Sequence, residues 1–312
     1  MYKSETELFK NFLIVFTSVV LSAFAILIDY TLTYALENST GVSTSTSITH
    51  HGVIDEETML QQFSKFINGK FDDTISTLEL VSQTNLFKNF DSTANISEVL
   101  HGVPNDVEKY KRELLSQILK ENDDIASIFL ILPNGNIYLG EPFADEKQLP
   151  RLNFADREWY IGANLRNSSY VSTVFSSAAI NAPAIAVAIP IMNWQADGPS
   201  VQYKDGLSST VGYIVAIMDF KSTKELLFKF LGETNDSFHV VDKNGTELID
   251  SSNKTYSTNL KSFNYLGIVK SDSNLKEMTS YKLNKGNESK LLHLMPMAIT
   301  GNTWYVIMVS PA

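Results

Sequence analysis

The feature that most constrains the fold is a layout of apolar segments that occurs twice in the chain. Three segments recur in the same order: 127–140 as 237–250, 183–191 as 289–299, and 211–220 as 301–312. The first segment reads as strand, turn and strand, with PNGN in one copy and KNGT in the other, and Asn-Gly between apolar runs is a strong hairpin signal. The repeat predicts two related α+β modules, each built on an antiparallel sheet. Coincidence is the alternative, because strand–turn–strand patterns are common.

The two copies differ in length. Matching positions lie 110 residues apart for Asn134 and Asn244, 106 for Pro190 and Pro296, and 92 for Tyr213 and Tyr305. The shrinking offset means that the first copy is longer between its hairpin and its last strand. That extra length holds the stretch NFADREWYIGANLRNSSYV (153–171) and the loop 193–211. A site in this stretch would therefore belong to the first module only.

Helical spacing precedes the strands. Apolar residues recur every three or four positions from Met59 to Leu78, which predicts a long helix over 55–82 that is roughly 40 Å long at 1.5 Å per residue. A second helix is predicted after Pro104, with Asn105 and Glu108 as a capping pair. The sequence thus predicts one long helix with two modules stacked beside it.

The N-terminus predicts a membrane segment. Residues 12–28 carry no charge, and an apolar stretch continues to Leu36, close to the roughly 20 residues that a bilayer core requires. Residues 1–11 then lie in the cytoplasm, 12–36 form a transmembrane helix, and 37–54 form a polar juxtamembrane spacer. A signal peptide cleaved after Ala25 is one alternative, although the apolar region continues past that point. A buried helix of a soluble domain is the other.

Composition excludes several functions. The 25 Lys and Arg residues stand against 35 Asp and Glu, and the net charge of −10 argues against a nucleic-acid partner. The chain has no cysteine, which removes disulfides, thiolate catalysis and cysteine metal sites. A hydrolase would need a nucleophile–base pair, and no motif marks one. Neither a metal nor a cofactor is predicted, and the chain is not expected to be an enzyme.

The candidate site lies in the first module. Five residues supply its charges and rings: Arg157, Trp159, Tyr160, Tyr170 and Asp219. The guanidinium group can pair with a carboxylate, the carboxylate group with an ammonium, and the rings can exclude water, so the set complements a small zwitterion. Each residue also has a structural alternative: an ion pair with Asp156 or Glu158 for the arginine, core packing for the aromatics, and a helix cap near Lys221 for Asp219.

The same residues carry a family resemblance. The stretch ADREWYIGANLRNSSYVSTVFSSAAINAPAIAVAIPI (155–191), followed by GYIVAIMDF (212–220), resembles the membrane-distal half of a double Cache sensor domain. Such domains occur outside the membrane in bacterial chemoreceptors, histidine kinases and diguanylate cyclases. The resemblance covers nearly all of 12–312 and implies two stacked PAS-like modules. The membrane-distal module with the long helix is then expected at 55–230 and the membrane-proximal module at 231–312.

The resemblance also implies roles. In amino-acid-binding members, the matching Arg and Trp hold the ligand carboxylate, so Arg157 and Trp159 inherit that role. The following Tyr and the Asp at the strand end hold the amino group, which implies Tyr170 and Asp219. The family pattern has a Tyr five residues before the Arg, where this sequence has Leu152. That departure leaves a related amine or a small carboxylate open as the ligand.

These features predict a membrane-anchored sensor domain of a bacterial receptor. It would bind an amino acid, amine or carboxylate and relay the event through the long helix. We expect residues from about 37 onward in the periplasm or extracytoplasmic space, anchoring in the bacterial inner membrane, and a homodimer paired through the long helix. An output domain is expected beyond Ala312 or in a partner chain. The alternative is a ligand-free structural or protein-interaction module, which Leu152 favours.

Overall fold

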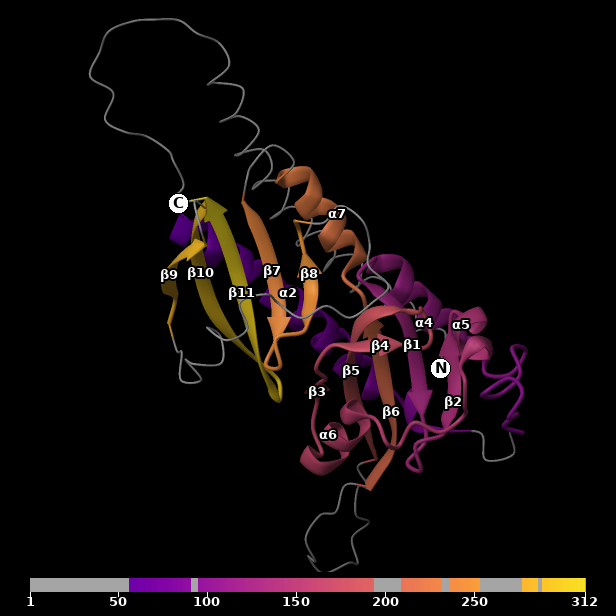
Figure 1. Ribbon diagram of the computed structural model, residues 1–312. Helices are drawn as coiled ribbons and strands as arrows, with labels where there is room; N and C mark the ends of the chain where they lie inside the picture. The colour runs from indigo at the N-terminus through magenta and orange to yellow at the C-terminus, as the bar shows by residue number, and fades with distance from the viewer. Residues whose placement is uncertain are drawn as a thin grey trace, which may run out of the picture. The chain divides into compact units, whose positions relative to one another are not determined.

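The computed structural model describes residues 56–90, 95–193, 209–231, 236–252, 277–285 and 288–311. All of them belong to one compact unit, Ile54–Ala312 (Figure 1). The predicted transmembrane helix at 12–36 and the spacer at 37–54 lie outside the described residues. Within the described ranges, no helix combines the length and the apolar content needed to cross a bilayer.

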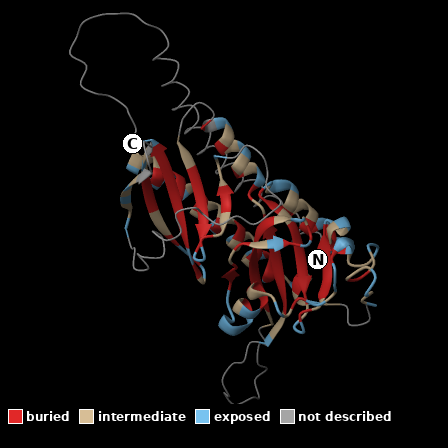
Figure 2. Ribbon diagram, in the orientation of Figure 1, coloured by how far each residue is buried: buried red, intermediate tan, exposed pale blue. Residues whose placement is uncertain are grey.

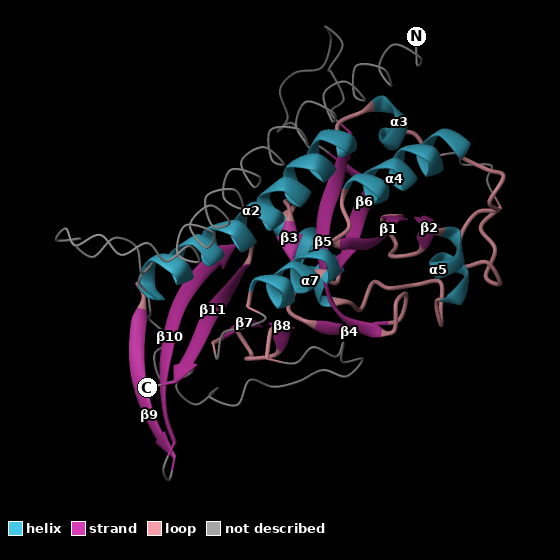
Figure 3. Ribbon diagram, turned by 90° about the horizontal axis from the view of Figure 1, so that it is seen from above, coloured by secondary structure: helices cyan, strands magenta, loops and turns pink. Residues whose placement is uncertain are grey.

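The predicted long helix is confirmed as α2, Glu56–Ser82. Its buried stripe repeats every three or four residues, as the spacing of apolar positions requires, and includes Leu60, Ile67 and Leu78, none of which is exposed. The helix contacts β5 and β6 of one sheet and β10 and β11 of the other (Figure 3). One helix therefore covers part of both sheets.

The first sheet is antiparallel, in the order β2-β1-β6-β5-β3, with β4 also paired to β5. Its strands are β1 Ile125–Ile131, β2 Ile137–Glu141, β3 Tyr170–Val171, β4 Phe175–Ser177, β5 Ala182–Asn193 and β6 Ser209–Met218. The second sheet is antiparallel in the order β8-β7-β11-β10-β9. Its strands are β7 Ser237–Asp242, β8 Glu247–Asp250, β9 Thr279–Lys285, β10 Glu288–Ile299 and β11 Asn302–Pro311. The predicted α+β fold with two antiparallel sheets is confirmed, and the central strands of both sheets are buried (Figure 2).

The two sheets repeat each other in register as well as in order. Pro190 of β5 lies opposite Tyr213 of β6, and Pro296 of β10 lies opposite Tyr305 of β11. These four residues are the ones that the repeated sequence layout aligns. Each hairpin turn also contains a glycine with positive φ, +85° at Gly135 and +77° at the equivalent turn of the second sheet, as Asn-Gly turns require. The predicted division into 55–230 and 231–312 stays a prediction.

In the described part of the chain, five further helices accompany the sheets: α3 Asn85–Lys88, α4 Lys109–Glu121, α5 Phe143–Gln148, α6 Glu158–Arg166 and α7 Lys221–Phe230. The predicted capping pair of α4 is wrong. The residue before this helix is Glu108, in a left-handed conformation with φ of 58°, and its side chain makes no capping bond. Its carboxylate instead accepts hydrogen bonds from Lys111 and from the Tyr138 hydroxyl, so a tertiary contact replaces the local cap.

A buried charge cluster joins α4 to β2 and α5. The Arg112 guanidinium donates to the carbonyl oxygens of Val103 and Gly140 and to the carboxylates of Glu141 and Glu146, at 2.8–3.1 Å. Glu146 is fully buried, and its Oε2 also accepts the Gly140 N–H at 2.7 Å. Two carboxylates thus share one guanidinium in an interior that penalises unpaired charge. Within the described part of the chain, Glu146 Oε1 has no hydrogen-bond partner.

This cluster predicts pH-dependent stability. Burial, opposed by Arg112, raises the pKa of Glu146 from 4.5 to about 7. The folded protein holds this proton more tightly than the unfolded chain does. The proton therefore stabilises the folded state fully below about pH 4.5, and this stabilisation is lost as the pH rises through about 7. The unfolding free energy of the wild type relative to Glu146→Gln should therefore fall by roughly 3 kcal/mol across that interval. Urea denaturation at several pH values measures it, and a constant difference would contradict the buried proton.

Candidate functional site

Helix α6 positions the first two candidate residues. Arg157 is extended, with φ of −77° and ψ of 143°, and its N–H donates to the Phe154 carbonyl at 3.1 Å. Its own carbonyl accepts the Ile161 N–H at 3.0 Å, which starts the helix. Trp159 follows in the first helical turn. The sequence therefore holds both side chains at the N-terminal end of α6, beside the first sheet.

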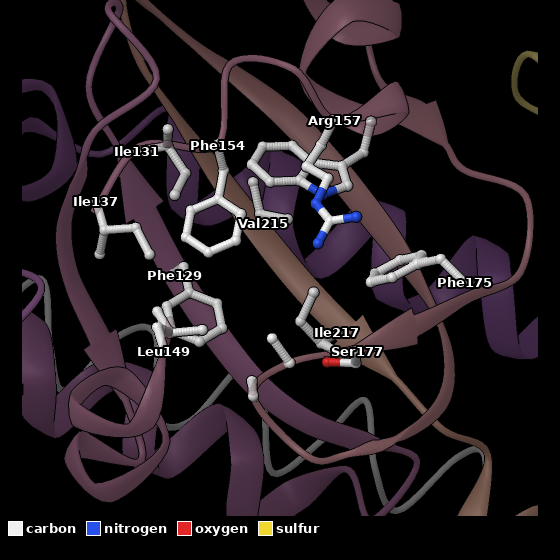
Figure 4. Close-up of a pocket in the computed structure, with 13 residues that line it drawn as sticks. Phe129, Ile131, Ile137, Leu149, Phe154, Arg157, Phe175, Ser177, Val215 and Ile217 are labelled. Atoms are coloured by element: carbon white, nitrogen blue, oxygen red, sulfur yellow. The ribbon is translucent and has the colours of Figure 1, made fainter. Parts of the chain in front are cut away.

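An apolar cavity of about 40 Å³ lies there, between the first sheet and the segments around α6. Its walls include Phe129 of β1, Val215 and Ile217 of β6, Phe154 and Phe175 (Figure 4). Arg157 and Trp159 also line it, and Arg157 is the one charged residue among the lining residues. A cationic group facing apolar and aromatic walls can select an anion that carries an apolar body.

The Arg157 side chain is half-buried and points into the cavity between two rings (Figure 4). Its guanidinium carbon lies 5.8 Å from the centre of the Phe154 ring and 5.9 Å from that of Phe175, within cation–π range. The suggested ion pairs with its neighbours are not formed. Asp156 is bonded to Arg151 at 2.5 and 2.7 Å, and Glu158 to Tyr170 and Thr173. No carboxylate of the described residues lies within ion-pairing distance of this guanidinium.

Tyr160 is buried but does not line the cavity. Its hydroxyl donates to the Pro133 carbonyl at 2.6 Å, in the turn between β1 and β2. Its ring packs edge-on against Tyr213 at 5.2 Å. These contacts hold α6 against the first sheet, so the structure gives Tyr160 a packing role. Its contact with a ligand stays a prediction.

Tyr170 also lies away from the cavity lining. It belongs to β3, and its hydroxyl donates to Glu158 at 2.8 Å while accepting the Asn302 amide at 3.2 Å. Asn302 begins β11 of the second sheet. Tyr170 therefore sits where the two modules meet, and a ligand contact for it stays a prediction.

Asp219 directly follows β6, whose residues Val215 and Ile217 line the cavity, but it does not line the cavity itself. Its Oδ1 accepts the Lys221 N–H at 3.1 Å, in a local turn just before α7, while the N-cap position of α7 is Phe220. Burial raises the pKa of the Asp219 carboxyl group above its usual value, and the hydrogen bond from Lys221 opposes this shift. The structure thus brings Arg157 and Trp159 together at the cavity without Asp219. Asp219 is not among the residues that line this cavity, and its contact with a ligand opposite Arg157 stays a prediction.

Leu152 brings no hydroxyl group to this region. It is partly buried and packs against the apolar cluster that contains the cavity walls. Phe175 and Glu158 were not predicted as site residues. No periodic or motif signal marks Phe175, because its place in the wall depends on the pairing of β4 with β5. Among the described residues, no group of three or more His, Asp or Glu side chains is arranged to hold a metal ion.

Comparisons with known proteins agree with this fold. A family model described as Cache domain matches residues 44–312. No curated protein matches the sequence significantly. Among solved structures, an extracellular ligand binding receptor from Desulfohalobium retbaense has a TM-score of 0.56 at 13% identity, over 83% of this chain and 41% of that one.

Two chemoreceptor domains are similar over most of their own length. The ligand-binding domain of Pseudomonas aeruginosa PctB, in complex with L-Gln, has a TM-score of 0.53 at 14% identity, over 81% of this chain and 88% of that one. The domain of Pseudomonas fluorescens CtaA, in complex with L-isoleucine, has a TM-score of 0.54 at 14% identity, over 82% and 90%. At these identities, the likeness shows the fold alone.

Proposed function

The chain belongs to the Cache domain family, and from that premise we propose that it is the extracytoplasmic ligand-sensing part of a bacterial transmembrane receptor rather than an enzyme. The family match over most of the chain supports a sensor role. The apolar segment 12–36 would anchor it in the membrane, and α2 would contribute to a homodimer and to the relay. Because α2 contacts both sheets, a ligand that changes its packing on one of them can alter the other.

The ligand of the first module is a small carboxylate with an apolar body. The observation that carries this assignment is the Arg157 guanidinium, which faces an aromatic and aliphatic cavity without a carboxylate partner among the described residues. A planar guanidinium in such surroundings favours a bidentate carboxylate. An ammonium group would find no acidic partner among the residues that line the cavity, so its desolvation would be uncompensated.

The cavity must widen to hold such a ligand. Its volume of about 40 Å³ is far below the roughly 300–1,000 Å³ of typical ligand pockets. Binding therefore requires part of the wall to move outward, and the free energy of that movement reduces the affinity.

Three compounds with one apolar group test the assignment. L-leucine carries both charges, 4-methylpentanoate lacks the ammonium, and 3-methylbutylamine lacks the carboxylate. In calorimetry with the full chain, we expect 4-methylpentanoate to bind at least as tightly as L-leucine, and the amine not to bind. Arg157→Ala should weaken 4-methylpentanoate binding by roughly 10- to 100-fold, because a hydrogen-bonded charge partner is lost.

Lys120→Ala is the control, because Lys120 is an exposed cation of α4 that does not line the cavity. It should leave the affinity for 4-methylpentanoate unchanged. Tighter binding of L-leucine that is lost in Asp219→Asn would instead support the predicted ammonium role of Asp219 and contradict a ligand without an ammonium group.

A ligand-free structural module is the second candidate. Two observations favour it: the small volume of the cavity, and the Asp219 side chain bonded to the start of α7. This function predicts no binding of any of the three compounds. It also predicts that Arg157→Ala changes only stability.

A further inference from the structure

Glu158 lies between Arg157 and Trp159 in the sequence but is not among the residues that line the cavity. Its carboxylate accepts the Tyr170 hydroxyl at 2.8 Å, the Thr173 N–H at 3.1 Å and the Thr173 hydroxyl. Although burial raises the pKa of Glu158, these hydrogen bonds hold it below its usual value, so the group is ionised at neutral pH. The start of α6 is thereby fastened to residues 170–174, which we call the 170–174 strip.

The second module contacts this strip through Asn302. Its buried side-chain amide donates to the Val171 carbonyl at 2.5 Å and to the Tyr170 hydroxyl at 3.2 Å, and lies 3.5 Å from Glu158. Its side-chain oxygen accepts the Lys243 ammonium at 2.6 Å. One asparagine of β11 therefore bonds both the strip and a turn of its own module.

Two backbone groups of the strip also bond the second module. The Val171 N–H donates to the Thr300 carbonyl at 3.1 Å, and the Val174 N–H donates to the Asp242 carboxylate at 2.9 Å. Burial raises the pKa of Asp242 above its usual value, and its hydrogen bonds from backbone N–H groups oppose this shift. The strip ends just before Phe175, a wall residue of the cavity. It therefore connects that wall directly to the second sheet.

The position of the strip determines which wall can yield to a ligand. Strands β1 and β6, which supply one wall, lie inside the sheet with a bonded neighbour on each side. Arg157, Trp159 and Phe175 come from the start of α6 and from β4, an off-path strand paired with β5. A ligand larger than the cavity displaces the less constrained wall. Glu158 links the two parts of that wall, because it belongs to α6 and its carboxylate is hydrogen-bonded to Thr173, two residues before Phe175.

We propose that Glu158 and Asn302 couple occupancy of the cavity to the second module, as positioning residues that do not touch the ligand. The inference rests on the proposed carboxylate site and adds a route that bypasses α2. Outward movement of α6 pulls on the Glu158 bonds, which strains the Asn302 contacts and the two backbone bonds to the second module. Binding and the state of this junction are then reciprocally linked.

Amide hydrogen exchange of the full chain, with and without saturating 4-methylpentanoate, measures the stability of the contacts between the 170–174 strip and the second module. The amides of Val171 and Val174 report its two backbone bonds. The variants are Glu158→Gln, which keeps the shape but removes the charge and replaces one of the two acceptor oxygens with an N–H donor, and Asn302→Ala in the other module. Asn164→Ala is the matched control, because Asn164 also lies on α6 but its side-chain bond, with Tyr213 at 2.8 Å, stays within the first module.

In the wild type and Asn164→Ala, we expect 4-methylpentanoate to change the exchange rates of these two amides by at least about fivefold. In Glu158→Gln and Asn302→Ala, calorimetry should still detect binding, while the probe-induced change in exchange is lost. A structural role alone would speed exchange in both variants and leave the probe-induced change in place, which would overturn the inference. Wild-type binding without any change at the two amides would also overturn it, while the carboxylate site would stand. Absence of binding to the wild type would remove both.

Discussion

Replacing Arg112 with methionine is expected to lower the free energy of unfolding by about 3–5 kcal/mol at pH 8. The substitution keeps much of the side-chain volume but leaves the buried carboxylates of Glu141 and Glu146 without their shared cation. It also leaves the carbonyl groups of Val103 and Gly140 without the donors that they now have. Urea denaturation followed by circular dichroism measures the loss.

The loss of unfolding free energy caused by Arg112→Met should depend on pH. At pH 5, Glu146 is protonated in the folded protein, so Arg112→Met removes less favourable charge pairing than at pH 8. Arg151→Met is the control, because the Arg151 pair with Asp156 is exposed and should contribute no more than about 1 kcal/mol. Equal losses for the two variants at pH 8 would show that the Arg112 cluster does not stabilise the fold.

Replacing Phe71 with alanine should lower the free energy of unfolding by about 3–5 kcal/mol, because the cavity left by the ring cannot collapse easily. Phe71 of α2 is fully buried. Its ring lies 5.3 Å from Phe220, which follows β6, and 5.7 Å from Trp304 of β11. One side chain of the long helix thus packs against residues of both modules.

The half-buried Phe66 of the same helix provides the comparison. Phe66→Ala removes the same atoms from a less enclosed position, so its cost should be clearly smaller. We also expect Phe71→Ala to lower a single unfolding transition, since both modules lose a contact. A separate early transition for one sheet, with the other unaffected, would contradict the shared packing.

Much of the fold could be predicted because it depends on local pattern. The apolar spacing from Met59 to Leu78 requires a helix wherever two sheets are available to bury it. The repeated prolines and tyrosines identify equivalent strands, because a strand register is set by which face is buried. Pro190 and Tyr213 accordingly meet across β5 and β6.

The sequence does not reveal contacts in which a side chain is bound by a distant element. Glu108 reads as a helix-capping residue, but Tyr138 lies 30 residues away and binds its carboxylate. The ligand contact of Tyr170 stays a prediction, but no local pattern marks the bond between its hydroxyl and Asn302, which is 132 residues away. A single sequence carries no periodic signal for such partners. Arg157 and Trp159 reach the cavity because their orientation is set locally, by the first turn of α6.

The packing of α2 on both sheets restricts how Cache domains of this kind can be recombined. A chimera that joins residues up to about 230 of one protein to the remainder of another would keep α2 with its own first sheet and pack the second sheet against a foreign helix. The side chains of α2 that face a given sheet must travel with that sheet. Exchange of the first sheet between relatives therefore calls for a second crossover within α2, near Phe71, in addition to the one between the modules.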